Sequence, residues 1–149
     1  MPINLVGSWK LLNCKQFDSN GLPEKDPFQD ASGMIIYDSD GMMSAHLMRS
    51  DHKSNLSNDI HQTSLESFKS LCESYIAYYG HYSINNDKNI VTHHVIGALW
   101  PSLIGEKLHR RFKFIDDNTL ILCNITPEAI GCEKPIVRYL TWQRLTTSK

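Results

Sequence analysis

Three polar side chains that could handle a proton and an oxygen atom lie in segments of alternating polarity. Tyr82, His93 and Arg110 each have apolar or glycine neighbours two positions away on both sides. Because successive side chains of a strand point to opposite faces, this spacing predicts that all three share an inner, apolar face. There, Arg110 could hold an enolate or carboxylate, His93 could move a proton and Tyr82 could donate a hydrogen bond.

The same pattern is compatible with a purely structural role. An inward arginine is costly to bury without partners, and backbone carbonyls or water near the rim of the fold could supply them. The prediction is therefore a polar cluster of Tyr82, His93 and Arg110. Catalysis and a structural hydrogen-bond network are its two alternative roles.

Further residues are predicted to contact a ligand around this cluster. Val95 and Phe112 fall on the faces of His93 and Arg110 and would add apolar wall. Four more come from separate segments: His46, Met48, Trp100 and Tyr139. Ordinary explanations stay open for several of them, namely a half-exposed strand position for the histidine, core packing for the methionine and a loop anchor for the tryptophan.

The histidines and cysteines predict neither a metal site nor a cofactor. His93 and His94 are adjacent in a strand and point apart, and no His-x-His, His-Glu-x-x-His or Cys-x-x-Cys spacing occurs. Glycine-rich nucleotide motifs and the Gly-x-Ser-x-Gly motif are absent as well. Any chemistry is therefore expected to be cofactor-free. The cysteines are expected to be reduced, with a Cys123–Cys132 pair as the alternative.

Composition and length limit the partners, the number of domains and the location that we expect for this chain. The 149 residues carry 15 basic and 16 acidic side chains with interspersed signs, so neither a nucleic acid nor an anionic membrane is an expected partner. A chain of this length is expected to form a single domain, residues 1–149. No long apolar run or secretory signal is present, which predicts a cytoplasmic protein.

Recurrent turn signals predict an all-β fold. Clusters of Asp, Asn and Gly at 18–21, 38–41, 85–89 and 116–118 separate runs of β-branched, aromatic and aliphatic residues. The runs predict eight strands, at 5–17, 33–38, 42–49, 80–84, 89–99, 107–115, 119–125 and 136–145. Hairpin connections of this kind predict an antiparallel sheet.

One segment has helical rather than strand periodicity. Apolar residues recur at three- and four-residue intervals from Leu65 to Tyr79, which predicts an α-helix over about 64–79, between the third and fourth predicted strands. Thr63 with Glu66 could form a capping box, and Gly80 stands where a helix C-terminus favours glycine. This helix is predicted to act as a plug or lid.

Two sequence patterns carry a resemblance to a known family. Gly7-Ser8-Trp9 near the start, together with Thr141-Trp142-Gln143-Arg144 near the end, resembles the lipocalin and calycin pattern. In that pattern a basic side chain packs over the first-strand tryptophan at the closed end of a barrel. The wider set, listed by number as 5–9, 40–49, 78–82, 91–94, 101, 105 and 110–112, is similar to the bacterial and fungal lipocalin-like domain family.

The resemblance implies an eight-stranded antiparallel barrel with an interior pocket, but no shared catalytic motif. It also implies an intracellular protein, since similar small barrels act inside cells and several are associated with natural-product biosynthesis. Three hypotheses follow. The barrel binds a small hydrophobic or aromatic metabolite; or it is a cofactor-independent cyclase or isomerase acting on a polyketide-like or unsaturated intermediate; or it is filled by its own side chains and forms a homo-oligomer.

Overall fold

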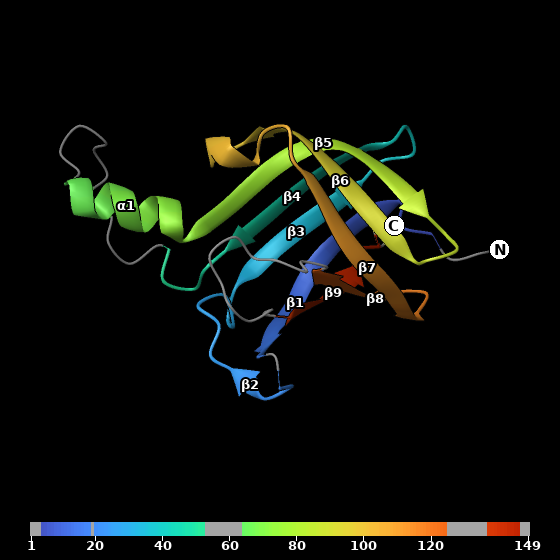
Figure 1. The fold of residues 1–149 in the computed structure, drawn as a ribbon, viewed down its shortest axis with the longest axis horizontal. Coiled ribbons are helices and arrows are strands. Elements are labelled where there is room, and N and C mark those ends of the chain that lie inside the picture. The colour runs from blue at the N-terminus through green and yellow to red at the C-terminus, as the bar shows by residue number, and fades with distance from the viewer. Residues whose placement is uncertain (1–3, 19, 53–63, 125–136, 147–149) are drawn as a thin grey trace.

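Strands of alternating burial make up most of the structure, a computed structural model that describes residues 4–18, 20–52, 64–124 and 137–146 (Figure 1). The helix α1 (Leu65–Glu73) lies between β4 and β5, and a short 3-10 helix, η2 (Pro101–Leu103), lies between β6 and β7. All eight strands expected from the sequence are present, and a two-residue strand, β2, pairs with the end of β1. The strands are β1 (Gly7–Phe17), β2 (Pro23–Glu24), β3 (Ser32–Tyr37), β4 (Met42–Met48), β5 (Tyr75–Asn85), β6 (Ile90–Ala98), β7 (Lys107–Asp116), β8 (Thr119–Asn124) and β9 (Val137–Arg144).

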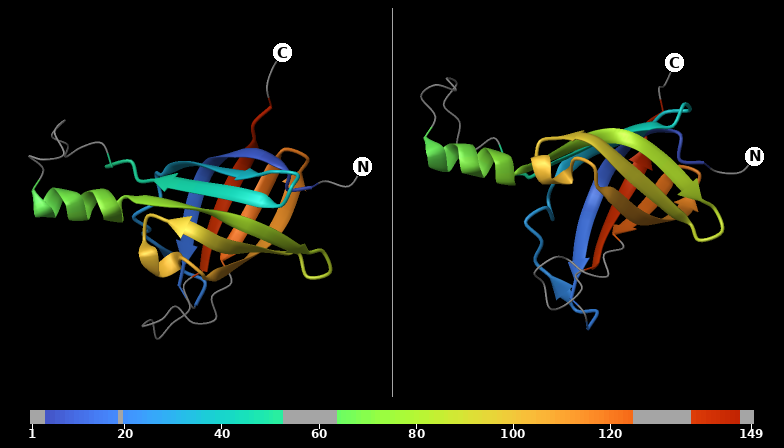
Figure 2. Two further views of the ribbon diagram at one scale, coloured as in Figure 1. Left: turned by 90° about the horizontal axis from the view of Figure 1, so that it is seen from above. Right: turned by 45° about the horizontal axis from the view of Figure 1, so that its top comes forward.

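The strands close into one antiparallel barrel (Figure 2). From β3 to β9 each strand pairs with the next one along the chain, and β1 completes the circuit by pairing with both β3 and β9. The β3–β4 turn illustrates the local chemistry. Asp38 Oδ1 accepts hydrogen bonds from the backbone N–H groups of Asp40 and Met42 at 2.9 and 2.8 Å, and Gly41 adopts a φ of +94°. The predicted barrel is confirmed.

Trp9 and Arg144 close one end of the barrel. The indole of Trp9 is fully buried, and the Arg144 guanidinium carbon lies 4.2 Å from its ring centroid. Arg144 also donates hydrogen bonds to the carbonyl oxygens of Val6 and Asn4, at 2.7 and 2.9 Å. A cation over an aromatic face, tied to the backbone, pins the first strand to the last. This contact is the one that the family resemblance implied.

The segment between β2 and β3 packs over part of the opposite end. Asp26 and Phe28 are buried there, and Asp26 Oδ2 lies 2.7 Å from Nε of Arg138 at the start of β9. The Arg138 guanidinium stands 5.7 Å from the centroid of the Phe28 ring. The Cys14 thiol donates to the same carboxylate at 3.3 Å. A buried carboxylate with a cationic partner and a further donor is well compensated for its lost hydration.

The helix is shorter than the sequence periodicity predicted. It ends at Glu73, and the segment from Tyr75 onward belongs to β5, which pairs along β4 from Met48↔Tyr75 to Met42↔His81. Tyrosine and isoleucine favour strands, and the pairing with β4 outweighs the local helical pattern. Gly80 is therefore no helix cap. It lies inside β5, where an added Cβ would clash with the backbone carbonyl oxygen of His94 in β6.

The role of plug or lid predicted for the helix was wrong. None of the α1 residues is buried, and Figures 1 and 2 show the helix extending away from the barrel. Ser64 is its N-cap, because its Oγ accepts a hydrogen bond from the Ser67 backbone N–H at 3.2 Å. The proposed capping residue Thr63 and Cys132 lie outside the described residues.

Within the described ranges, no helix is long and apolar enough to cross a membrane.

Candidate functional site

A partly enclosed cavity of about 130 Å³ lies inside the barrel. Its wall is mostly aliphatic and aromatic, and its polar groups come from β5, β6, β7, β8 and β9. The cavity lies toward the barrel end at which β8 finishes and β9 begins, as its lining residues Asn124 and Arg138 indicate. The full lining is Ile35, Ala45, Leu47, Ile76, Tyr78, His93, Arg110, Leu122, Asn124, Arg138, Leu140 and Trp142.

His93 is the most buried polar group on this wall, and both of its ring nitrogens are engaged. Nε2 lies 2.7 Å from the hydroxyl oxygen of Tyr37, and Nδ1 lies 2.9 Å from that of Tyr78. Burial, followed by the positive charge of Arg110 and the neighbouring His94, lowers the pKa of His93 to about 3. The imidazole is therefore neutral at physiological pH, and it holds two phenols in place.

The two phenols are also neutral. Burial raises the pKa of Tyr37 well above its ordinary value, and it raises the pKa of Tyr78 against the opposing effect of Arg110. Arg110 borders the same cavity as Tyr78, and its positive charge acts on the Tyr78 hydroxyl. Tyr78 thus stands between a neutral imidazole and a cation, and its hydroxyl remains able to donate.

Arg110 and Arg138 both border the cavity but differ in how their charges are balanced. Arg138 is paired with the buried carboxylate of Asp26, at 2.7 Å through Nε and 3.2 Å through a second nitrogen. Arg110 is half-buried and donates to the backbone carbonyl of His109 at 3.0 Å. Within the part of the chain that the structure describes, no carboxylate forms an ion pair with Arg110. Its charge is thus available to an anionic or strongly polar group in the cavity.

Comparison with known proteins agrees with this architecture. A family model described as a lipocalin-like domain matches residues 6–145, nearly the whole chain. The chain belongs to the lipocalin-like domain family. No curated protein sequence matches it.

Two solved structures are similar to this lipocalin-like chain at low sequence identity. The structure of EF1p2_mFAP2b bound to DFHBI is 14% identical over 95% of this chain and 94% of the other, with a TM-score of 0.45. A mutant of the fluorescent protein UnaG is 12% identical over 96% of this chain and 97% of the other, with a TM-score of 0.35.

The lipocalin-like barrel brings two of the three predicted cluster residues to the cavity. His93 and Arg110 both border it, as the alternation of β6 and β7 predicted. Tyr82 does not border the cavity. Its ring packs edge-on against that of Tyr37, with 4.9 Å between the ring centroids, and its hydroxyl donates to the carbonyl oxygen of Asp38 at 2.6 Å. Tyr82 lies near the end of β5, so the adjacent β3–β4 turn captures its hydroxyl.

Tyr37 and Tyr78 are site residues that sequence reasoning missed. Tyr78 lay within the segment assigned to the helix, so its strand face was not considered. Tyr37 follows Ile35 by two positions in β3, and both side chains are buried. That alternation was visible in the sequence and could have placed Tyr37 on the inner face.

The residues predicted as further ligand contacts divide between the two faces of the barrel. Val95 and Phe112 are buried inside the barrel but do not border the cavity. Four lie toward the outside, where each is at least partly exposed: His46, Met48, Trp100 and Tyr139. In β4 the inner face is taken by Met43, Ala45 and Leu47, so His46, between the last two, points outward. It bonds to a neighbouring serine at 3.2 Å and to a β5 tyrosine hydroxyl at 3.1 Å.

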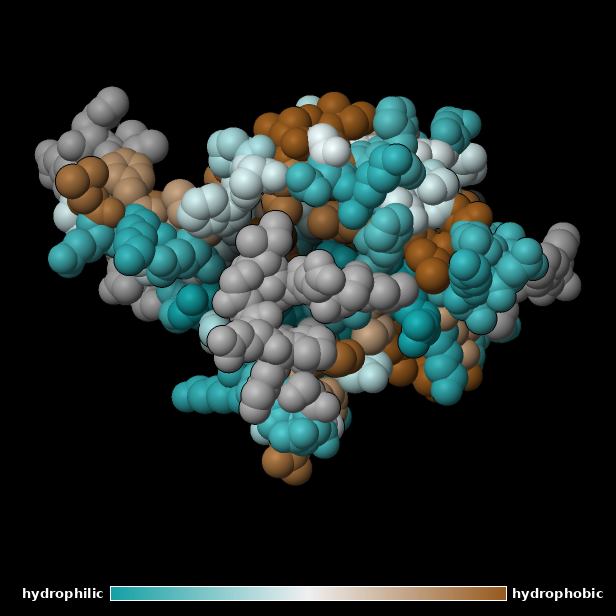
Figure 3. Space-filling model, in the orientation of Figure 1, coloured by the Kyte–Doolittle hydropathy of each residue, from teal (hydrophilic) through white to brown (hydrophobic). Residues whose placement is uncertain are grey.

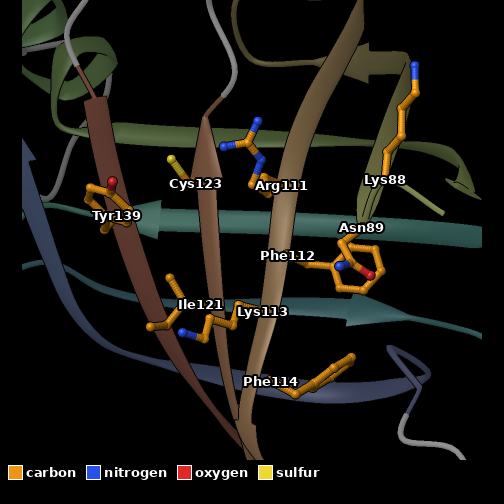
Figure 4. Close-up of a pocket in the computed structure, with 9 residues that line it drawn as sticks. All are labelled: Lys88, Asn89, Arg111, Phe112, Lys113, Phe114, Ile121, Cys123 and Tyr139. Carbon is orange, nitrogen blue, oxygen red and sulfur yellow. The ribbon is translucent and has the colours of Figure 1, made fainter. Parts of the chain in front are cut away.

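A second hollow, of about 840 Å³, is larger but open to solvent (Figure 4). It lies where β7 continues past the start of β6, and Figure 4 shows aromatic rings beside cationic side chains. The cations Lys88, Arg111 and Lys113 are exposed and therefore well hydrated. The interior cavity is the stronger candidate site because it is less open and because His93 and Tyr78 are buried in its wall. No group of His, Cys, Asp or Glu in the described ranges is arranged to hold a metal ion.

Proposed function

We propose that this lipocalin-like barrel binds one small, mostly apolar or aromatic molecule in its interior cavity. The observation that carries the proposal is a partly enclosed, largely apolar cavity inside the barrel, with a few convergent polar groups in its wall, the usual composition of a small-molecule site. Its 130 Å³ is below the ~300–1,000 Å³ of drug-sized pockets and near the ~150 Å³ of an apolar cavity that holds benzene. The occupant is therefore about the size of a single ring.

A cavity-filling variant tests this proposal. Ala45 borders the cavity, and Ala45→Leu adds bulk directly into it. Two-dimensional NMR of the ¹⁵N-labelled protein detects binding of a probe such as toluene. We expect the wild type to bind toluene and Ala45→Leu to lose this binding. Ala77→Leu is the matched control, because Ala77 lies on β5 at a position facing away from the cavity. Unchanged toluene binding by Ala45→Leu would contradict an interior site.

Native mass spectrometry of the purified protein addresses the natural occupant. A small molecule that stays with the folded protein and leaves on denaturation is the result that the proposal expects. Loss of that mass in Ala45→Leu would link the molecule to the cavity. A co-purified molecule retained by Ala45→Leu would place its site elsewhere and count against the proposal.

A cofactor-independent isomerase or cyclase is the second candidate function. The observation in its favour is that Tyr78 and Arg110 offer two donors to the same cavity, an arrangement that can polarise a substrate carbonyl. His93 would then act through Tyr78, since both of its nitrogens are occupied. For an enzyme, His93→Ala and Arg110→Ala abolish turnover of the co-purified molecule. For a binder, the same variants change its affinity and nothing else.

A filled barrel that acts through its outer surface is the third candidate. The 130 Å³ of internal space supports the binding proposal over it. The outer surface does carry apolar area near β5 and η2 (Figure 3), where Ile96, Leu99 and Ile104 are exposed. Sedimentation velocity across a range of protein concentrations tests for a homo-oligomer, and a concentration-independent monomer argues against one.

A further inference from the structure

The hydrogen bonds around His93 can be arranged in only two ways. A neutral imidazole has one N–H group and one nitrogen lone pair. Tyr37 lies 2.7 Å from Nε2 and Tyr78 lies 2.9 Å from Nδ1. One phenol must therefore donate to the ring, and the other must accept from it.

Burial of Tyr37 selects between the two arrangements. Tyr37 has no exposed surface, and among the described residues His93 is the only hydrogen-bond partner of its hydroxyl. If Nε2 carried the proton, the Tyr37 O–H would be left without an acceptor in a dry environment, which is costly. Tyr37 therefore donates to Nε2, and the proton of His93 sits on Nδ1 and is donated to Tyr78.

This arrangement leaves the Tyr78 hydroxyl as a donor directed at the cavity. Its oxygen receives the Nδ1–H of His93, and the positive charge of Arg110 borders the same cavity. Its own proton has no acceptor within the described part of the chain. Tyr78 is 9% exposed and borders the cavity, as does Arg110. Two neighbouring donors, one of them cationic, thus face the same small space.

We propose, on the basis of the binding function above, that the cavity selects ring compounds carrying an anionic, acceptor-only oxygen, such as a monocyclic carboxylate. The carboxylate accepts hydrogen bonds from Tyr78 and Arg110, and its negative charge meets a cation without a carboxylate partner among the described residues. Tyr37 and His93 are positioning residues that aim the Tyr78 hydroxyl. An amine in the same place would meet donors and a like charge, so cationic rings are excluded.

Three probes of similar size test this selectivity: benzoate, toluene and benzylamine. By NMR titration of the wild type, benzoate is expected to bind at least about tenfold more tightly than toluene, because a hydrogen bond to a charged group gives about tenfold to a hundredfold. Benzylamine is expected not to bind. Tyr78→Phe should weaken benzoate binding about tenfold, since Arg110 remains, while toluene affinity is kept. Tyr79→Phe is the matched control, since Tyr79 is the next residue of β5 and is 53% exposed.

The possible outcomes distinguish the carboxylate selectivity from the underlying proposal that the cavity binds a small molecule. Toluene binding that equals or exceeds benzoate binding overturns the carboxylate selectivity and leaves interior binding intact. Binding of none of the probes to the wild type overturns both proposals. A measurement on the wild type is independent of any variant's folding: the ¹⁵N shifts of the His93 ring should show a protonated Nδ1 and an unprotonated Nε2. The reverse pattern refutes the assigned hydrogen-bond direction.

Discussion

Acidification should destabilise this barrel through His93. The pKa of His93 is lowered from 6.5 to about 3, chiefly by burial. An unfolded chain therefore binds a proton as the pH falls through about 6.5, whereas the folded chain does so only near pH 3. Because the unfolded state binds more protons in this window, stability is full above pH 6.5 and falls as the pH is lowered toward 3. From pH 7.5 to pH 5, this single group should cost about 2 kcal/mol.

Urea unfolding followed by tryptophan fluorescence measures this loss. The comparison is between the wild type and His93→Gln at both pH values, because the glutamine retains a polar side chain and cannot titrate. The wild type should lose about 2 kcal/mol more than His93→Gln between the two pH values. His81→Gln, at an exposed position of the same barrel, should keep the wild-type pH dependence. Equal pH dependence in the wild type and His93→Gln would refute the buried, neutral imidazole.

Three further effects follow from the buried contacts. Asp26→Ala removes the buried partner of the partly exposed Arg138 and should cost about 1–3 kcal/mol in urea unfolding, as losing a charged hydrogen bond does. Gly80→Ala places a Cβ against the carbonyl oxygen of His94, so it should lower the free energy of unfolding by more than about 3 kcal/mol or prevent folding. The pKa of Cys14 is raised to about 12 by burial and by the adjacent carboxylate. Its alkylation by iodoacetamide at pH 8, followed by peptide mass mapping, should be about a thousandfold slower than in urea.

The two substitutions each have a control in the same chain. Asp30→Ala removes an exposed carboxylate from the same segment and should change stability by less than about 0.5 kcal/mol. Gly21→Ala has open space around the new Cβ but a φ of +78°, so a smaller cost of about 1 kcal/mol is expected. A Gly80→Ala cost equal to that of Gly21→Ala would argue against the close approach of β5 to β6. Rapid labelling of Cys14 in the native protein would argue against its burial.

Local alternation was enough to predict the inner face of several strands. Val91 and Val95 flank His93, and Leu108 and Phe112 flank Arg110, so the period of two placed both polar groups inside the barrel. The turn residues located the hairpins, because Asp, Asn and Gly supply the hydrogen bonds and positive φ that tight turns need. The strand order, the barrel and the tryptophan–arginine contact at its closed end followed from these local signals and the family resemblance.

Tertiary contacts decided the composition of the site. The Tyr75–Tyr79 stretch has a helical pattern in isolation, and only its pairing with β4 makes it a strand and turns Tyr78 inward. The capture of the Tyr82 hydroxyl by a carbonyl of the β3–β4 turn is likewise invisible in the sequence.

The sequence by itself thus determined the barrel and the inward direction of His93 and Arg110, since side-chain direction repeats with a fixed local period. Only the folded chain decided which hydroxyls meet that histidine and how much space remains beside them. Those properties depend on contacts between residues far apart in the chain, such as Tyr37 and His93, and on how completely the side chains fill the interior.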